Sequence, residues 1–172
     1  MSAVAVATRV LHPGDVACAD AGERLETLLG SCVAVILTDP RRTVGAMCHI
    51  VHADDAPRAA PRAGARGRAG PRTRDRRSAH HAEPAIDAMF AQLRARAIEP
   101  RLCDAYVFGG GNMFPGLMRG PAQVGDRNVD AVLRRLGAEG VRIVRHDVGG
   151  AAYRRLGWTV GPDEPEVVAV PV

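Results

Sequence analysis

The sequence predicts a single layered α/β (α+β) domain over residues 1–172, with mixed sheets and two helices. A chain of 172 residues that is 47% hydrophobic is long enough for one domain with its own core. Short apolar runs typical of strands alternate with two segments of helical periodicity, which indicates layers of sheet and helix. Residues 33–37 are apolar at every position, so we expect this strand to be covered on both faces.

The first half of the chain is predicted to form strands. Residues 5–19 read as one or two short strands broken by the turn His12-Pro13-Gly14-Asp15, and residues 25–29 as a short extended segment. A hairpin follows, because the apolar runs 33–37 and 44–49 flank Asp39-Pro40-Arg41-Arg42. That tetrapeptide suits a type I turn with Asp first and Pro second.

The second half combines two helices with four strands. Glu83-Pro84 starts the first helix, whose apolar positions are Ile86, Met89, Phe90, Leu93 and Ala97. Asp126 is the expected N-cap of the second helix, which ends near Gly137 or Gly140 and buries Val129, Val132, Leu133 and Leu136. Strands are expected at 103–108 and 141–148, and a closing hairpin at 157–160 and 167–170.

Cys32 and His49 form the candidate catalytic pair. If the hairpin turn is centred between residues 40 and 41, these residues lie directly opposite each other, with Cβ atoms about 5 Å apart. A thiol beside an imidazole is the basic pair of nucleophilic thiol catalysis, and Gly30-Ser31 forms a tight turn before the cysteine. A bulge of one residue would separate the pair, and a buried free cysteine with a core histidine is the plainer interpretation.

Several segments together resemble one known family. Leu29-Gly30-Ser31-Cys32-Val33 with His49 downstream resembles the chemoreceptor glutamine deamidases of bacterial chemotaxis, the CheD family. The resemblance continues through Val107-Phe108-Gly109-Gly110-Gly111-Asn112-Met113-Phe114, Arg127-Asn128-Val129 and Asp147-Val148-Gly149-Gly150, in the order of the family. It covers most of residues 8–160.

This resemblance implies a fold and an activity. One face of the central sheet would carry helices and the other a further sheet, similar to the catalytic domains of deamidating bacterial toxins. The activity would be that of a cysteine-dependent protein-glutamine glutaminase, which converts glutamines in the cytoplasmic domains of methyl-accepting chemoreceptors to glutamate. Cys32 would attack the side-chain amide to form a thioester and release ammonia, His49 would act as acid and base, and backbone N–H groups of the Gly30-Ser31-Cys32 turn would bind the oxyanion. No cofactor or metal is implied, the location is the cytoplasm, and a CheC-type phosphatase is a candidate partner.

A third catalytic residue is expected upstream of Cys32, because members of the family carry a threonine there. In one subset it stands six positions before the cysteine, where this chain has Glu26; Thr27 stands five before. One residue of offset reverses the facing of a strand, so we expect Thr27 to reach the site through an irregular backbone. The adjacent Leu28 and Leu29 favour such a kink. The alternative is that Glu26 orients His49 as a carboxylate.

The glycine segment at 109–111 lacks the spacing of dinucleotide-binding and P-loop motifs. We expect a loop that allows close approach of a peptide substrate, with Gly110, Asn112 and Phe114 at its wall; a plain tight turn is the alternative.

Other classes of function find less support. Cys48 and His49 are neighbours on a strand and face opposite ways, which argues against a shared metal site. The net charge of +4 arises in residues 57–77, which contain eight arginines and no aromatic residue. We expect a disordered loop at about 55–78 and no nucleic-acid binding. No apolar run is long enough to cross a membrane, and no export signal is evident. A non-enzymatic chemotaxis adaptor and a cysteine amidase with another substrate remain the alternative functions.

Overall fold

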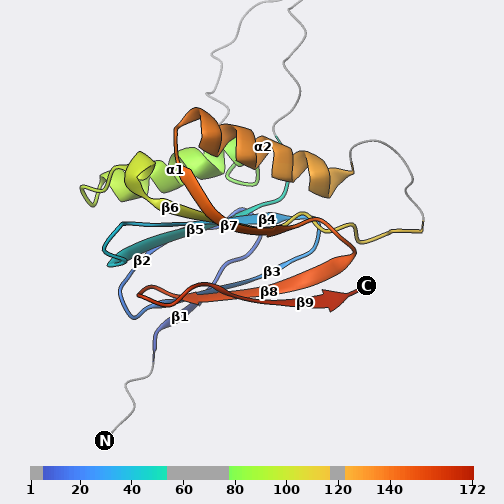
Figure 1. The fold of residues 1–172 in the computed structure, drawn as a ribbon, viewed down its shortest axis with the longest axis horizontal. Helices are drawn as coiled ribbons and strands as arrows, with labels where there is room; N and C mark the ends of the chain where they lie inside the picture. The colour runs from blue at the N-terminus through green and yellow to red at the C-terminus, as the bar shows by residue number, and fades with distance from the viewer. Residues whose placement is uncertain (1–5, 54–77, 117–122) are drawn as a thin grey trace, which may run out of the picture.

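Two helices, a five-stranded sheet and a four-stranded sheet lie one above the other in the part of the chain described by the computed structural model, residues 6–53, 78–116 and 123–172 (Figure 1). The helices cover one face of the five-stranded sheet, and the four-stranded sheet covers its other face (Figure 1). This arrangement confirms the predicted layered α/β fold, with two helices on one face and a further sheet on the other.

The five-stranded sheet is the central layer. Its order is β2-β5-β4-β6-β7, and β7 runs parallel to β6 whereas the other neighbours are antiparallel. The bounds of its strands are Val16–Asp20 for β2, Val33–Thr38 for β4, Val44–Ile50 for β5, Asp104–Gly109 for β6 and Arg142–Val148 for β7.

The outer sheet has the order β1-β3-β8-β9. Its strands are β1 (Thr8–Val10), β3 (Arg24–Leu29), β8 (Ala152–Thr159) and β9 (Glu166–Pro171). β8 is longer than the predicted 157–160, because it pairs with the whole of β3, from Arg24 opposite Thr159 to Leu29 opposite Arg154. The two arginines at 154 and 155 interrupt the apolar pattern, so the sequence did not reveal the first half of this strand.

The two helices are α1 (Ala82–Arg94) and α2 (Val124–Ala138), and a short 3-10 turn (η1) spans Pro100–Leu102. The predicted N-cap of α2 at Asp126 is wrong. Gln123 is the N-cap, and its carbonyl accepts a hydrogen bond from the Arg127 N–H at 3.1 Å. Asp126 instead lies in the first turn, where a carboxylate interacts favourably with the helix dipole.

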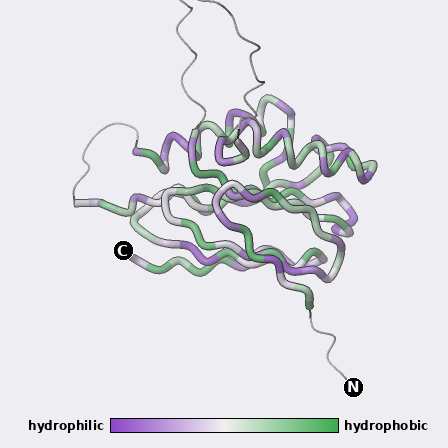
Figure 2. Tube along the Cα trace, turned by 180° about the vertical axis from the view of Figure 1, so that it is seen from behind, coloured by the Kyte–Doolittle hydropathy of each residue, from purple (hydrophilic) through white to green (hydrophobic). Residues whose placement is uncertain are grey.

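Strand β4 separates two apolar cores, as its uninterrupted hydrophobic sequence predicted. Val33, Val35 and Leu37 pack toward the helices, whereas Ala34 and Ile36 pack toward the outer sheet. Figure 2 shows hydrophobic stretches along the strands of the central layer and hydrophilic stretches on the helices. The core between the sheets consists of Leu11, Ala17, Ala19, Leu25, Leu29, Ala34, Ile36, Met47, Tyr106, Phe108, Leu156, Trp158 and Val160.

Two further predictions concern the arginine-rich loop and the membrane. The loop expected at about 55–78 lies, except for Ser78, outside the described residues. Within the described residues, no helix is long and apolar enough to span a membrane.

Candidate active site

The candidate nucleophile Cys32 lies where the chain crosses from the outer sheet to the central one. β3 ends at Leu29 and β4 begins at Val33, so Gly30, Ser31 and Cys32 make the crossing. Cys32 is half-buried and packs against the core between the two sheets. The other three cysteines of the chain are buried, so Cys32 is the most accessible thiol.

The glycine segment holds the turn that contains Cys32. The Gly111 N–H donates to the Gly30 carbonyl at 2.8 Å, and the Gly110 N–H donates to the Cys32 carbonyl at 2.8 Å. Gly109 adopts a φ of 111°, and a Cβ there would lie 2.2 Å from the Cys32 carbonyl oxygen. A side chain at residue 109 would therefore push away the turn formed by Gly30, Ser31 and Cys32 (the nucleophile turn).

The predicted register of the hairpin is wrong by two residues. His49 pairs with Ala34, and Ile50 pairs with Val33. The expected turn does form, since the Arg42 N–H donates to the Asp39 carbonyl at 2.9 Å, but Arg42 then adopts a φ of 57°. A residue in this left-handed conformation after a type I turn lengthens the loop and shifts the pairing.

A shift of two residues keeps Cys32 and His49 on the same side of the sheet. Side chains alternate with a period of two, so the residues become diagonal neighbours, for which separations of about 7–8 Å are usual. The His49 Nε2 atom is buried and has no hydrogen-bond partner among the described residues, so Cys32 and His49 do not hydrogen-bond in this structure. Catalysis by this pair requires the thiol to move toward the ring.

Thr27 contacts His49 across the two sheets. The Thr27 Oγ1 lies 2.8 Å from the His49 Nδ1 and also donates to the Leu11 carbonyl at 2.8 Å. A hydroxyl has one proton; if Leu11 accepts it, Thr27 must accept the proton of His49 Nδ1. The contact therefore favours the tautomer in which Nε2 keeps a free lone pair.

The irregular backbone expected before Cys32 is absent from β3. The strand pairs without a shift from Arg24 to Leu29, and Thr27 faces the core between Leu25 and Leu29. Leu28, expected to help kink the strand, is instead exposed on the outer face. Plain alternation therefore brings Thr27 to His49.

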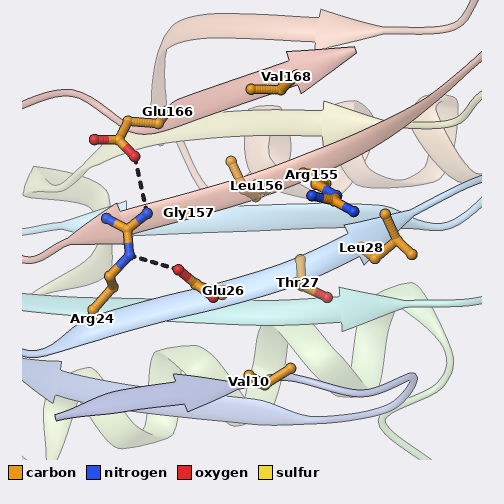
Figure 3. Close-up of a pocket in the computed structure, with 10 residues that line it drawn as sticks. All are labelled: Val10, Arg24, Glu26, Thr27, Leu28, Arg155, Leu156, Gly157, Glu166 and Val168. Atoms are coloured by element: carbon orange, nitrogen blue, oxygen red, sulfur yellow. Dashed lines mark hydrogen bonds and ion pairs between the residues drawn. The ribbon is translucent and has the colours of Figure 1, made fainter. Parts of the chain in front are cut away.

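Glu26, the alternative third residue, lies on the opposite face of β3. Its carboxylate accepts a hydrogen bond at 2.7 Å from Arg24, which also contacts Glu166 at 2.9 Å (Figure 3). These side chains border a hollow of about 410 Å³ on the outer sheet, which neither Cys32 nor His49 lines. Glu26 does not contact His49.

Burial keeps both candidate catalytic groups neutral. Desolvation raises the pKa of the Cys32 thiol above its ordinary value and lowers that of the His49 imidazole below its own. The resting site therefore favours a thiol and a neutral imidazole. Cys48 behaves as an inert core residue, as predicted: it packs on the helix side of β5, and burial raises its pKa to about 12.

The remaining predicted site residues lie near the turn but are engaged differently. The Gly110 N–H is used by the Cys32 carbonyl, and the Asn112 Oδ1 accepts from the Phe114 N–H at 3.0 Å. Phe114 is 60% exposed. The side chains of Met113 and Tyr153 approach Gly30, where a Cβ would lie 2.9 Å from the Met113 sulfur. Met113 and Tyr153 therefore border the turn at Gly30.

Two buried polar residues near the site were not predicted. Asn128 donates from Nδ2 to the Ser31 carbonyl at 3.1 Å and to the Val51 carbonyl at 2.8 Å. Arg154 contacts Asp147 at 2.9 Å and anchors the turn before β8. The signal for Asn128 was present in the sequence, since it shares a helix face with Val132 and Leu136, and a polar residue there requires a partner. Within the described residues, no three His, Cys, Asp or Glu side chains gather in a way that could hold a metal.

Comparison with known proteins identifies the family. The family model described as CheD chemotactic sensory transduction matches residues 66–162, more than half of the chain. A probable chemoreceptor glutamine deamidase CheD 2 from Albidiferax ferrireducens is 33% identical over 151 residues, which cover 87% of this chain and 80% of the relative. The chain belongs to the CheD family.

Further CheD relatives match most of the chain at similar identity. A probable chemoreceptor glutamine deamidase CheD from Pseudomonas savastanoi pv. phaseolicola is 31% identical over 155 residues, which cover 89% of this chain and 79% of the relative. One from Thermococcus kodakarensis is 29% identical over 128 residues, which cover 74% of this chain and 71% of the relative. The range matched by the CheD family model contains the glycine segment and Asn128, and begins downstream of Cys32 and His49.

Proposed function

We propose that this chain is a protein-glutamine deamidase that converts glutamine side chains in the cytoplasmic domains of chemoreceptors to glutamate. The names of the CheD relatives support the substrate and the reaction. The observation that supports the chemistry is the setting of His49: the Thr27 hydroxyl lies 2.8 Å from its Nδ1, and Nε2 is buried with no partner among the described residues. An imidazole held in this way is ready to accept a proton from a thiol.

The proposed reaction begins at Cys32. When the substrate amide enters, the thiol proton passes to the His49 Nε2 and the sulfur attacks the side-chain amide carbon. The carbonyl oxygen becomes an oxyanion near the N–H groups of Ser31 and Cys32. No backbone carbonyl of the described residues accepts a hydrogen bond from either group. Donors that are already oriented and unused suit this role.

The second half of the reaction restores the enzyme. The imidazolium donates its proton to the departing nitrogen, the carbon–nitrogen bond breaks, and ammonia leaves a thioester on Cys32. Water then loses a proton to Nε2 and attacks the thioester. The carbon–sulfur bond breaks, the sulfur takes back the proton, and the substrate leaves as glutamate. The neutral resting state of both groups fits this cycle, because His49 passes on each proton that it accepts, first to the departing nitrogen and then to the sulfur.

The test is incubation of the purified chain with receptor cytoplasmic fragments, followed by peptide mass spectrometry of each glutamine. We expect conversion to glutamate by the native chain and none by Cys32→Ala. Receptor binding by the native chain without conversion would favour an adaptor, and conversion of other amides alone would favour a different amidase. Adding a CheC-type phosphatase to the same assay tests it as a second partner.

A further inference from the structure

Asn128 holds the middle of the nucleophile turn. It lies on α2, is fully buried, and reaches a carbonyl that is 97 positions away in sequence, that of Ser31. Its amide nitrogen also donates to the Val51 carbonyl, two residues after His49. One side chain therefore ties the segment that carries Cys32 to the end of the strand that carries His49.

Three successive carbonyls of the turn have defined partners. Backbone N–H groups of the glycine segment hold the carbonyls of Gly30 and Cys32, and the carbonyl between them is held by the side chain of Asn128. The described residues contain no cis peptide bond. In a trans peptide the C=O and the following N–H lie in one plane and point in opposite directions, so fixing the Ser31 carbonyl fixes the Cys32 N–H.

We infer that Asn128 is a positioning residue that aims the Cys32 N–H at the oxyanion, an inference that rests on the proposed deamidase function. Asn128 acts through the peptide group and does not touch the substrate. Its Oδ1 is buried without a partner among the described residues, which is an unfavourable state. An apolar residue at this position would avoid the buried oxygen without a partner but would leave the Ser31 carbonyl without the hydrogen bond from Asn128.

The kinetic test compares Asn128→Leu with the native chain on receptor fragments. Leucine has a similar size but no donor. We expect kcat to fall by about 10²-fold, as for loss of one oxyanion donor, while KM changes little. The rate of Cys32 alkylation by iodoacetamide should also stay near that of the native chain, because alkylation needs no oxyanion donor.

Thr38→Val is the matched control for a general loss of stability. Thr38 is also fully buried, and its hydroxyl donates to the Val44 carbonyl at 3.1 Å at the far end of β4. We expect this variant to lose stability but to keep kcat. An Asn128→Leu variant that folds and keeps kcat, or one in which kcat falls only as far as in Thr38→Val, would overturn the inference.

A second measurement does not depend on deamidation. Labelling with ¹⁵N-cysteine gives one backbone amide signal for each of the four cysteines. In the native chain the Cys32 amide should have an order parameter of about 0.85, as expected for rigid backbone. In Asn128→Leu, and in Asn128→Asp if the leucine variant does not fold, only the Cys32 signal should shift and lose order.

The two proposals fail in different ways. If the native chain converts no glutamine, the proposed function fails, and the amide signal of Cys32 still decides whether Asn128 positions it. A Cys32 amide in the native chain with an order parameter below about 0.6, the range of flexible backbone, would overturn the inference whatever the activity. Unchanged Cys32 signals in a folded Asn128 variant would do the same.

Discussion

Replacement of Thr27 by valine tests how the protein prepares His49. Valine keeps the branched shape but removes the hydroxyl that lies 2.8 Å from both the His49 Nδ1 and the Leu11 carbonyl. Thr27 is 5% exposed and His49 is 3% exposed, so water cannot readily replace the lost hydroxyl. Each buried group left unsatisfied costs about 1–3 kcal/mol, and we expect the free energy of unfolding to fall by about 2 kcal/mol.

The effect on activity follows from the tautomer and from the charge of His49. Without Thr27, the preference for a proton on Nδ1 weakens, and His49 with a proton on Nε2 cannot accept one from Cys32. Equal populations of the two tautomers would lower kcat only about 2-fold, but Thr27 also accepts a hydrogen bond from the imidazolium that forms during the reaction. Loss of a hydrogen bond to a charged group, about 1.5–3 kcal/mol, corresponds to about a 10- to 100-fold lower kcat. Thr27→Ser keeps the hydroxyl, so its kcat and stability should stay close to those of the native chain.

Two measurements decide this prediction. Urea unfolding gives the change in stability, and mass spectrometry of receptor fragments gives kcat. Glu26→Gln is the control on the outer face of the same strand, and we expect it to leave kcat unchanged. If Thr27→Val retained native kcat and stability, or if only Glu26→Gln lost activity, the assignment of Thr27 would be refuted.

Three further predictions test the site. Cys32→Ala should abolish deamidation without lowering the melting temperature. Cys48→Ser places a hydroxyl in the apolar core and should lower the free energy of unfolding by about 1–3 kcal/mol, as measured by chemical unfolding. Loss of deamidation in Cys48→Ser and loss of stability in Cys32→Ala would contradict the choice of nucleophile. Because burial lowers the pKa of His49 in the folded state, the unfolded chain binds the proton more tightly, and stability should fall as the pH drops below about 6.5. His49 contributes at most about 1.4 kcal/mol per pH unit to the dependence of stability on pH, and His49→Gln should remove this contribution. An equal pH dependence of stability in His49→Gln would rule out His49 as its source. Gly110→Ala places a Cβ 2.4 Å from a side chain of α2 at a φ of 66° and should lower both kcat and stability, whereas Gly137→Ala meets no atom within 4 Å and should be tolerated in the same thermal and kinetic assays.

Local patterns in the sequence determined the layers and the facing of single residues. The uninterrupted apolar run of β4 predicted a strand between two cores. The periodicity of the two helices predicted the face that they bury, except that Ala97 lies beyond the end of α1 and is exposed. Alternation also placed Cys48 and His49 on opposite faces of one strand, as found. These properties depend on residues close together in the chain, and side chains alternate or repeat with fixed periods there.

Only the tertiary structure decided which of these faces meet. The hairpin register depended on the left-handed conformation of Arg42. The turn-forming residues Asp39 and Pro40 predict a turn but do not specify this conformation. The contact between Thr27 and His49 joins two sheets, and that between Asn128 and Ser31 joins a helix to a turn. Such contacts depend on how separate layers stack, and periodicity within one segment gives only the direction of a side chain, not the group that it meets.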